Sequence, residues 1–307
     1  MITFKAKTAS GEIIKSALTP FSFPAGEAHL KREDRRELEP TEIAILQPSA
    51  DSLHDDLFKL NMWGDYLNRK WDEKTGAPTT VLVLPYIPGA RADRVEGEAP
   101  FGLEVYSDFI NAMLFDQIIV LDPHSDVSVD MLWDAGDNGI TVVNSDEVLT
   151  TGVASIFNFS GYSGIIAPDK GAVPRATAVA EALGIPVFKA GKTRNPDTGK
   201  LSGFTCEPLP EFGKFLLVDD ICDGGGTFLG LADATELSKD RLDLYVTHGV
   251  FSGKALDILP TKFGRIFTTN SYDPHRNLNT ERDSIINSSN QPFVRMDITR
   301  LLLSKIK

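Results

Sequence analysis

Short apolar runs recur along this chain, and each is followed by a polar or glycine-containing turn and then by a helix-like stretch. This alternation is typical of α/β proteins, in which helices connect parallel strands. Parallel strands are buried on both faces, so they read as continuous apolar runs. The sequence therefore predicts strands at residues 43–46, 81–84, 118–121, 165–167, 215–218 and 244–246, and helices at 176–183 and 228–237.

The length of the chain predicts two domains, because 307 residues exceed the size at which one core usually keeps growing. A polar stretch at residues 134–146 separates the earlier strands from the later ones. We place the domains at residues 1–145 and 146–307. The chain ends in a strand or turn and a short amphipathic helix that packs rather than reacts, and this last helix could pack back on the first domain.

The charge and composition of the chain exclude several classes of function. The 31 basic and 43 acidic residues give a net charge of −12, which argues against nucleic-acid or membrane binding as the main role. No apolar run approaches the about 20 residues of a membrane span, and the amino terminus lacks the apolar core of a signal peptide. We therefore expect a cytoplasmic protein. The two cysteines, Cys206 and Cys222, are too few for a disulfide framework or a structural zinc site.

The most specific motif joins the predicted strand at 215–218 to the helix at 228–237. It contains Asp219, Asp220 and Asp223, then Gly224, Gly225, Gly226 and Thr227. Glycines let backbone N–H groups approach an anion at a helix start, and carboxylates accept hydrogen bonds from sugar hydroxyls. An N-cap aspartate and a glycine turn would explain parts of the string, but the whole string predicts a site for a sugar phosphate.

A second loop follows the predicted strand at 165–167. It gathers Asp169, Lys170, Gly171 and Arg175 at one turn. Aspartate binds hard cations such as Mg²⁺ through oxygen, glycine admits a phosphate close to the backbone, and the cations offset its charge. Alone, the loop is equally typical of a solvated turn with a helix cap. Beside the first motif it predicts a magnesium and pyrophosphate site.

Two further segments carry candidate chemistry. His124 ends a predicted strand between acids and could join a metal shell, although a lone histidine is more often a surface residue. Lys192 and Arg194 lie in a glycine- and proline-containing stretch at 189–199, which we expect to be flexible. Such a loop could close over phosphates and stabilise charge in transfer, or it could be an ordinary exposed loop.

The first half offers two nucleotide-binding candidates. Arg91, Asp93 and Arg94 follow the strand at 81–84, and the two arginines could grip a triphosphate. Phe23 could stack on an adenine whose amino group donates to Glu27. A salt-bridged surface turn and a turn with an apolar anchor are the respective alternatives.

Taken in order, these segments resemble the ribose-phosphate pyrophosphokinase (phosphoribosyl pyrophosphate, PRPP, synthetase) family over nearly the whole chain. The strings at 247–253 and 269–270 add to the resemblance. It implies an α/β fold of two tandem phosphoribosyltransferase-like domains, each a mainly parallel sheet flanked by helices, with the ATP side in the first. It also implies a homo-oligomer, dimer or hexamer, in which Phe23 and Glu27 would serve a neighbouring subunit.

The resemblance implies transfer of a diphosphoryl group from Mg-ATP to the C1 hydroxyl of ribose 5-phosphate, giving PRPP and AMP. Lys192 and Arg194 would be catalytic, and His124 and Asp169 would hold Mg²⁺. Arg175, Lys170 and Gly171 would complete the pyrophosphate loop. The remaining roles are ATP binding by Phe23, Glu27, Arg91, Asp93, Arg94 and His124, and ribose-phosphate binding by Asp219, Asp220 and 223–227.

The chain departs from the family pattern in several places. Gly224 stands where threonine is usual, which removes a hydroxyl from the phosphate loop. Ala92, Ala25 and Glu98 also differ from the usual glutamine, Asp or Asn, and arginine. Residues 126–133 replace a glutamine-rich stretch linked to control by phosphate and ADP. The loss at Gly224 motivates an alternative acceptor, ADP-ribose, as in NAD salvage, and a non-catalytic regulatory homologue is a further alternative.

Overall fold

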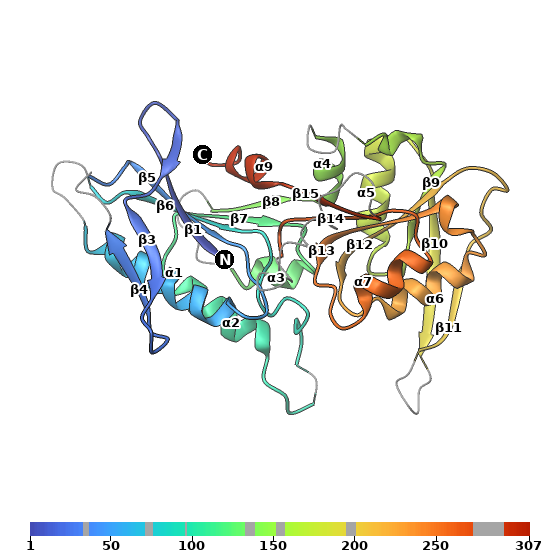
Figure 1. Ribbon diagram of the computed structural model, residues 1–307, viewed down its shortest axis with the longest axis horizontal. Coiled ribbons are helices and arrows are strands. Elements are labelled where there is room, and N and C mark those ends of the chain that lie inside the picture. Colours follow the sequence, from blue (N-terminus) through green and yellow to red (C-terminus); the bar gives the residue numbers. More distant parts are fainter. Residues whose placement is uncertain are drawn as a thin grey trace. The chain divides into compact units, whose positions relative to one another are not determined.

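The structure is a computed structural model that describes residues 1–32, 37–70, 76–95, 97–132, 139–151, 157–194, 201–272 and 292–307. The described residues form two compact units. Unit 1 consists of Met1–Val143 together with Thr299–Lys307, and unit 2 consists of Asn144–Ile298 (Figure 1). This division falls two residues from the boundary predicted between 145 and 146.

Unit 1 is built on a six-stranded sheet in the order β2-β1-β5-β6-β7-β8. The strands β5 to β8 are parallel, whereas β1 pairs antiparallel with both of its neighbours. A separate antiparallel hairpin is formed by β3 and β4. The strand bounds are β1 Ile2–Lys7, β2 Ile13–Lys15, β3 Leu18–Ser22, β4 Ala28–Arg32, β5 Thr41–Leu46, β6 Thr79–Leu84, β7 Gln117–Leu121 and β8 Gly139–Val143.

Helices cover both faces of this sheet, with α1 and α2 on one face and α9 on the other (Figure 1). Their bounds are α1 Leu53–Asn68, α2 Gly102–Asn111, α3 Asp126–Asp130 and α9 Thr299–Leu303. Trp63 of α1 is fully buried and stacks on Phe4 of β1, with ring centroids 5.4 Å apart. The apolar stripe of α1 thus closes the core against the sheet.

The last residues of the chain are held in unit 1 by hydrogen bonds between their backbone groups and side chains of the sheet. The buried Gln117 side chain donates to the Lys305 carbonyl at 3.0 Å and accepts from the Lys307 amide at 3.2 Å. The Lys7 ammonium donates to the Ile306 carbonyl at 3.3 Å. These bonds satisfy a buried amide that would otherwise carry a desolvation cost.

Unit 2 is built on a seven-stranded sheet in the order β11-β10-β9-β12-β13-β14-β15, parallel except for the hairpin of β10 and β11. In Figure 1, α4 and α5 lie on one face of this sheet and α6 and α7 on the other. The strands are β9 Gly164–Ala167, β10 Val187–Arg194, β11 Leu201–Cys206, β12 Phe215–Cys222, β13 Leu242–Gly249, β14 Ile266–Thr269 and β15 Phe293–Met296. The helices are α4 Ser145–Thr150, η1 Phe159–Gly161, α5 Val173–Leu183, α6 Gly226–Ala234, η2 Lys239–Arg241, α7 Ala255–Ile258 and η3 Leu259–Thr261.

The strand order of unit 2 reverses between β9 and β12. From β9 the chain crosses through α5 to β10 on one side, and from β12 it crosses through α6 to β13 on the other. At such a switch point the two loops after the strands diverge and leave a crevice, where open α/β sheets bind ligands. The loops that follow β9 and β12 are the two motifs singled out in the sequence.

The predicted α/β fold of two mainly parallel sheets flanked by helices is confirmed. All six predicted strands and both predicted helices are present, with bounds shifted by a few residues. The expectation of a flexible loop over 189–199 is wrong for its first part, because residues up to Arg194 belong to β10. That strand is held by antiparallel pairing with β11, the next strand along the chain.

Candidate functional site

The loop after β9 brings Asp169 against Lys192. The Lys192 ammonium lies 2.7 Å from Asp169 Oδ2, and the Ala172 amide donates to Asp169 Oδ1 at 3.1 Å. Burial alone would raise the pKa of Asp169, but the bond and charge of Lys192, together with the backbone N–H groups of Ala172 and Gly171, lower it overall. Asp169 is therefore an anion held between the Lys192 ammonium and the backbone N–H groups of the turn.

The carboxyl-terminal part of β12 presents two adjacent carboxylates to one arginine. Arg175 Nη1 lies 3.8 Å from Asp219 Oδ1 and 3.8 Å from Asp220 Oδ1. Burial raises the pKa of Asp219 well above its ordinary value, and the charge of Asp220 raises it further, although Arg175 acts in the opposite direction. The Asp220 amide donates to Asp219 Oδ1 at 3.0 Å. Two acids that repel each other are thus held ready for donors such as sugar hydroxyls.

The three glycines after these acids have different roles. Gly225 caps α6 with a φ of 79°, and a Cβ atom there would meet Leu259 Cδ2 at 3.1 Å. Gly224 and Gly226 do not have a positive φ. A Cβ atom on Gly224 would meet Ser252 Oγ at 3.9 Å, an ordinary contact distance. Only Gly225 of this triplet is therefore required by the backbone.

The start of α6 is suited to an anion. Its first amide groups, including that of the half-buried Thr227, have no partner within the helix and carry the positive end of the helix dipole. Asp223 precedes them and accepts a hydrogen bond from the Ser252 hydroxyl. Ser252 was not among the predicted site residues, although it lies in the segment 247–253 that contributed to the family resemblance.

The hairpin of β10 and β11, which carries Lys192, packs against α6. A Cβ atom on Gly230 of α6 would lie 2.1 Å from Cε2 of Phe204, which belongs to β11. The glycine therefore permits a close approach between β11 and α6. Phe204 and Gly230 are structural residues of the site that sequence reasoning missed.

Fewer contacts are described for the other predicted site residues of unit 2. Lys170 is exposed at the turn after β9, and a Cβ atom on Gly171 would meet Asp169 Oδ1 at 3.3 Å. The backbone of Arg194 ends β10, while its side chain lies outside the described residues.

In unit 1 the nucleotide candidates lie on two segments. Phe23 is 47% exposed near the tip of the β3–β4 hairpin, where its ring stacks on His29 with centroids 5.4 Å apart. The Phe23 amide donates to the Glu27 carbonyl at 2.8 Å, so both residues belong to one turn, and the Glu27 residue is exposed. The hairpin thus presents an aromatic ring beside an acid at the surface.

The other first-unit segment follows β6. Arg91 and Arg94 are exposed, and Asp93 Oδ1 lies 3.3 Å from Arg94 Nε. Gly89 sets the turn, since its φ is 77° and a Cβ atom would meet Tyr106 Cδ2 at 2.8 Å. The surface salt bridge anticipated as the alternative is therefore present.

His124 lies in the loop after β7 and is exposed. The loop begins with Asp122, which is buried and has a φ of 39°. A left-handed conformation in a non-glycine residue is uncommon and often accompanies a functional site. The Asp122 amide donates to the Val143 carbonyl at 2.7 Å, which holds the loop in place.

Asp169 is an ionised carboxylate at the turn after β9, and oxygen ligands of this kind suit Mg²⁺. No group of three or more potential ligands of the His, Cys, Asp and Glu types is found among the described residues. Mg²⁺ is commonly held by one or two carboxylates with water and substrate phosphates, so a single ionised aspartate at a phosphate loop fits that ion. A shared role for His124 and Asp169 in holding it stays a prediction.

Comparisons with known proteins agree with this arrangement. The profile of the phosphoribosyl transferase domain family matches residues 163–236, which contain both loops. A ribose-phosphate pyrophosphokinase of Pyrococcus furiosus is 29% identical over 276 residues, covering 87% of this chain and 91% of the relative. Another from Bradyrhizobium diazoefficiens is 29% identical over 249 residues, covering 75% and 70% respectively. The PRPP synthetase structure from Mycobacterium smegmatis shares the fold, with a TM-score of 0.72, 21% identity, and coverage of 94% and 89%.

The fold and the two loops therefore define a protein of the phosphoribosyltransferase type. The relatives that match along most of the chain are ribose-phosphate pyrophosphokinases, a more specific group than phosphoribosyltransferase-type proteins in general. Along most of its length the chain is similar to members of the PRPP synthetase family, as its motifs predicted. Across the described residues, no helix has both the length and the apolar character needed to cross a membrane.

Proposed function

We propose that this protein is an ATP-dependent diphosphokinase. In the proposed reaction the C1 hydroxyl of ribose 5-phosphate attacks the β-phosphorus of Mg-ATP. The bond between the α- and β-phosphoryl groups breaks, so the products are PRPP and AMP, and the hydroxyl proton leaves to solvent. The names of the relatives, ribose-phosphate pyrophosphokinases, support this assignment.

The convergence of three charged segments at the switch point of unit 2 carries the proposal. Asp169 after β9 contacts Lys192 of β10, while Arg175 of α5 contacts the acids that end β12. A sugar phosphate held at the start of α6 and a diphosphate held at the loop after β9 would therefore be neighbours. Reactions of this kind are accelerated mainly by positioning and by neutralising charge.

Each group has a proposed task in that reaction. Asp219 and Asp220 accept hydrogen bonds from the ribose hydroxyls, and the amides from Asp223 to Thr227 hold the 5-phosphate. Lys192 leaves Asp169 when anionic substrates bind and then stabilises charge on the transferred group, together with Arg194. Mg²⁺ bound with ATP would supply the main neutralisation of phosphate charge.

The ATP side is proposed for unit 1. Phe23 and Glu27 would bind adenine, Arg91 and Arg94 the phosphates with Asp93 orienting Arg94, and His124 the metal–phosphate end. The exposed hairpin that carries Phe23 suits an assembly in which it serves a neighbouring subunit. A homo-oligomer is therefore part of the proposal.

A second candidate acceptor, ADP-ribose, is favoured by the space at Gly224. The backbone there does not require glycine, and the nearest contact for a Cβ atom is Ser252 Oγ at 3.9 Å. Replacing the usual threonine by glycine thus leaves room beside the 5-phosphate position. A ribose whose phosphate continues as a diester could use that room.

The test is to incubate the full chain with Mg-ATP and either ribose 5-phosphate or ADP-ribose, and to measure AMP release. AMP that depends on ribose 5-phosphate supports the first proposal. AMP with ADP-ribose alone transfers the proposal to the alternative acceptor. The absence of AMP with both acceptors, from protein that unfolds cooperatively, would favour a non-catalytic regulatory homologue.

A further inference from the structure

A cavity lies at the edge of the unit 2 sheet where the strands begin, at the other end of the strands from the candidate site. Its volume is about 270 Å³. Tyr162, Lys214 and Arg265 lie just before β9, β12 and β14, and Asp243 is near the start of β13. The catalytic candidates follow the carboxyl ends of β9 and β12. The cavity is therefore separated from them by the length of the strands.

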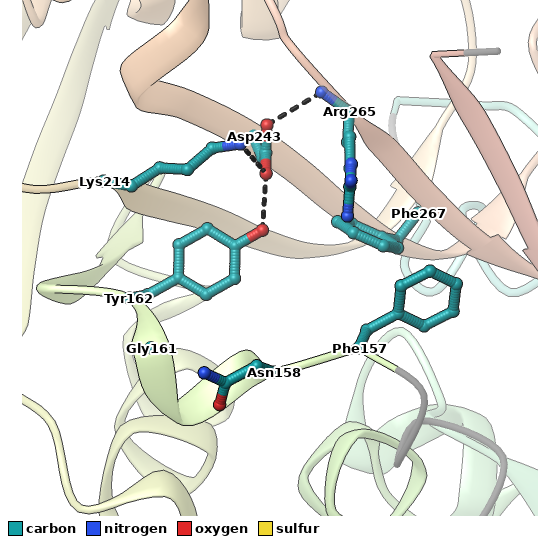
Figure 2. A pocket seen from close by; sticks show the side chains of 8 residues that line it. All are labelled: Phe157, Asn158, Gly161, Tyr162, Lys214, Asp243, Arg265 and Phe267. Atoms are coloured by element: carbon teal, nitrogen blue, oxygen red, sulfur yellow. Dashed lines mark hydrogen bonds and ion pairs between the residues drawn. The ribbon is translucent and has the colours of Figure 1, made fainter. Parts of the chain in front are cut away.

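Asp243 forms the polar base of this cavity, and its charge is already satisfied. The side chain is fully buried and accepts hydrogen bonds from the Tyr162 hydroxyl at 2.5 Å and from the Arg265 amide at 2.7 Å. The Lys214 ammonium lies 2.7 Å from its Oδ2 atom (Figure 2). Burial and the nearby Asp243 charge raise the pKa of Tyr162, so its hydroxyl stays a donor. Asp243 thus holds the residues around the cavity in place and has no role in binding a ligand.

The cavity has an excess of positive charge. Lys214 and Arg265 each contribute one positive charge, against one negative charge from Asp243. Lys214 is 37% exposed, so its ammonium also reaches solvent, and an ammonium has three donors. Within the described part of the chain the Arg265 guanidinium pairs with no carboxylate. In Figure 2 its side chain extends away from Asp243 toward Phe267. This local charge contrasts with the net −12 of the whole chain.

The cavity also has aromatic residues in its lining. Phe157, Tyr162 and Phe267 contribute to its lining. The rings of Phe157 and Phe267 meet edge to face, with centroids 5.2 Å apart. Figure 2 shows these aromatic side chains from different segments around the same space as the two cations. Aromatic faces favour a planar, apolar ligand group.

We propose that this cavity binds a small aromatic anion, of the class of single-ring carboxylates. The ring would lie against Phe157, whose position is fixed by the buried Phe267. The anionic group would accept hydrogen bonds from Lys214 and Arg265. A volume of about 270 Å³ is slightly below the range of about 300–1,000 Å³ for ligand pockets. It therefore suits a compact ligand. The site is distinct from the proposed catalytic loops and does not depend on the proposed function.

Ligand-observed NMR titrations of the full chain test the two parts of this proposal separately. Benzoate carries both the ring and the charge, benzyl alcohol carries the ring alone, and inorganic phosphate carries the charge alone. Saturable benzoate binding is expected, with an affinity about fivefold higher than that of benzyl alcohol, which is the upper end of the effect of one exposed ionic contact. Phosphate is not expected to displace benzoate. No saturable benzoate binding, or equal binding of benzyl alcohol, would overturn the proposal.

A variant locates the binding. Arg265→Gln removes the guanidinium but retains the backbone N–H bond to Asp243, so folding is expected to persist. It should weaken benzoate binding about fivefold. Arg69→Gln, an exposed arginine of unit 1, should leave it unchanged. Equal benzoate affinity in both variants, or displacement of benzoate by ribose 5-phosphate, would show that the anion binds elsewhere.

Lys214→Met is a less suitable variant. It would leave the buried Asp243 without its paired cation, which is strongly destabilising in general. Loss of binding in that variant could therefore reflect unfolding. Arg265→Gln avoids this ambiguity because its thermal midpoint can be compared with that of the unmodified protein.

Discussion

The ammonium of Lys192 lies 2.7 Å from the carboxylate of Asp169, so the cation proposed for catalysis pairs with the acid proposed to meet Mg²⁺. Each charge is neutralised by the other until a ligand enters. Anionic substrates have to replace an existing partner rather than bind to a bare cation. This arrangement links binding of the diphosphate side to movement of the Lys192 side chain.

Lys192→Ala should lower turnover about 100- to 1,000-fold, the range for loss of one group that stabilises transition-state charge. The free energy of unfolding should change by less than about 1 kcal/mol, because the ion pair is partly exposed. Steady-state AMP release and urea denaturation measure the two effects. Lys239→Ala, at an exposed lysine in η2, is the matched control and should retain full turnover. An unfolded or fully active Lys192→Ala protein would contradict the assignment.

Gly224→Thr should shift acceptor preference toward ribose 5-phosphate. The backbone accommodates a side chain at this position, and the new hydroxyl would lie near the 5-phosphate. One added hydrogen bond to a charged group is worth about 1.5–3 kcal/mol, so the ratio of kcat/KM for ribose 5-phosphate over ADP-ribose should rise about 10-fold or more. A ratio that is unchanged in an active, folded variant would show that Gly224 does not set acceptor choice.

Two alanine substitutions separate the roles of neighbouring glycines in stability. Gly225→Ala should destabilise the protein by about 1–2 kcal/mol, since its φ of 79° disfavours a side chain. Gly226→Ala should be neutral or stabilising by up to about 1 kcal/mol, because it begins α6 and no described atom lies within 4 Å of its Cβ position. Denaturant titrations of both variants measure the difference. Equal destabilisation would argue against the left-handed cap at Gly225.

Asp219→Asn should stabilise the fold at neutral pH while lowering activity. Burial and the charge of Asp220 raise the folded-state pKa of Asp219, so the native state binds more protons than the unfolded state above pH 3.8. The contribution of this group is fully present below that pH and is lost as the pH rises through the raised pKa. Removing the charge should therefore raise the free energy of unfolding at pH 7.

Denaturation as a function of pH checks the sign of this effect. The difference between Asp219→Asn and the unmodified protein should grow from acid toward neutral pH. Glu236→Gln, which alters an acid with an exposed side chain beyond α6, should show no such growth. A destabilised Asp219→Asn protein at pH 7 would mean that Arg175 overcomes the repulsion between the two acids.

Local patterns in the sequence were sufficient for the parts of the site that lie within one loop. The acids and glycines at 219–227 follow a continuous apolar strand, and that order alone predicts a ligand loop. Which glycine is required could not be predicted, because only the folded position of Leu259 and the φ of Gly225 distinguish it. Pairing of Lys192 with Asp169 and packing of Phe204 on Gly230 depend on contacts between separate elements. Such contacts leave no short-range pattern.

One missed element did have a signal in the sequence. In β1 the residues Ile2, Phe4 and Ala6 are buried and alternate with partly exposed ones. This period of two is typical of a strand with one covered face. Continuous apolar runs, which mark strands covered on both faces, do not include this alternating pattern.

The hydrogen bonds between Gln117 and the main chain at Lys305 and Lys307 have a consequence for biosynthesis. Unit 1 closes with residues that the ribosome adds after all of unit 2. During translation the side chain of Gln117 therefore lacks its partners at Lys305 and Lys307 while unit 2 already has its complete sequence. The usual order of amino-terminal folding first is thus interrupted here, and a nascent chain stalled before residue 299 should hold unit 1 in a protease-sensitive state.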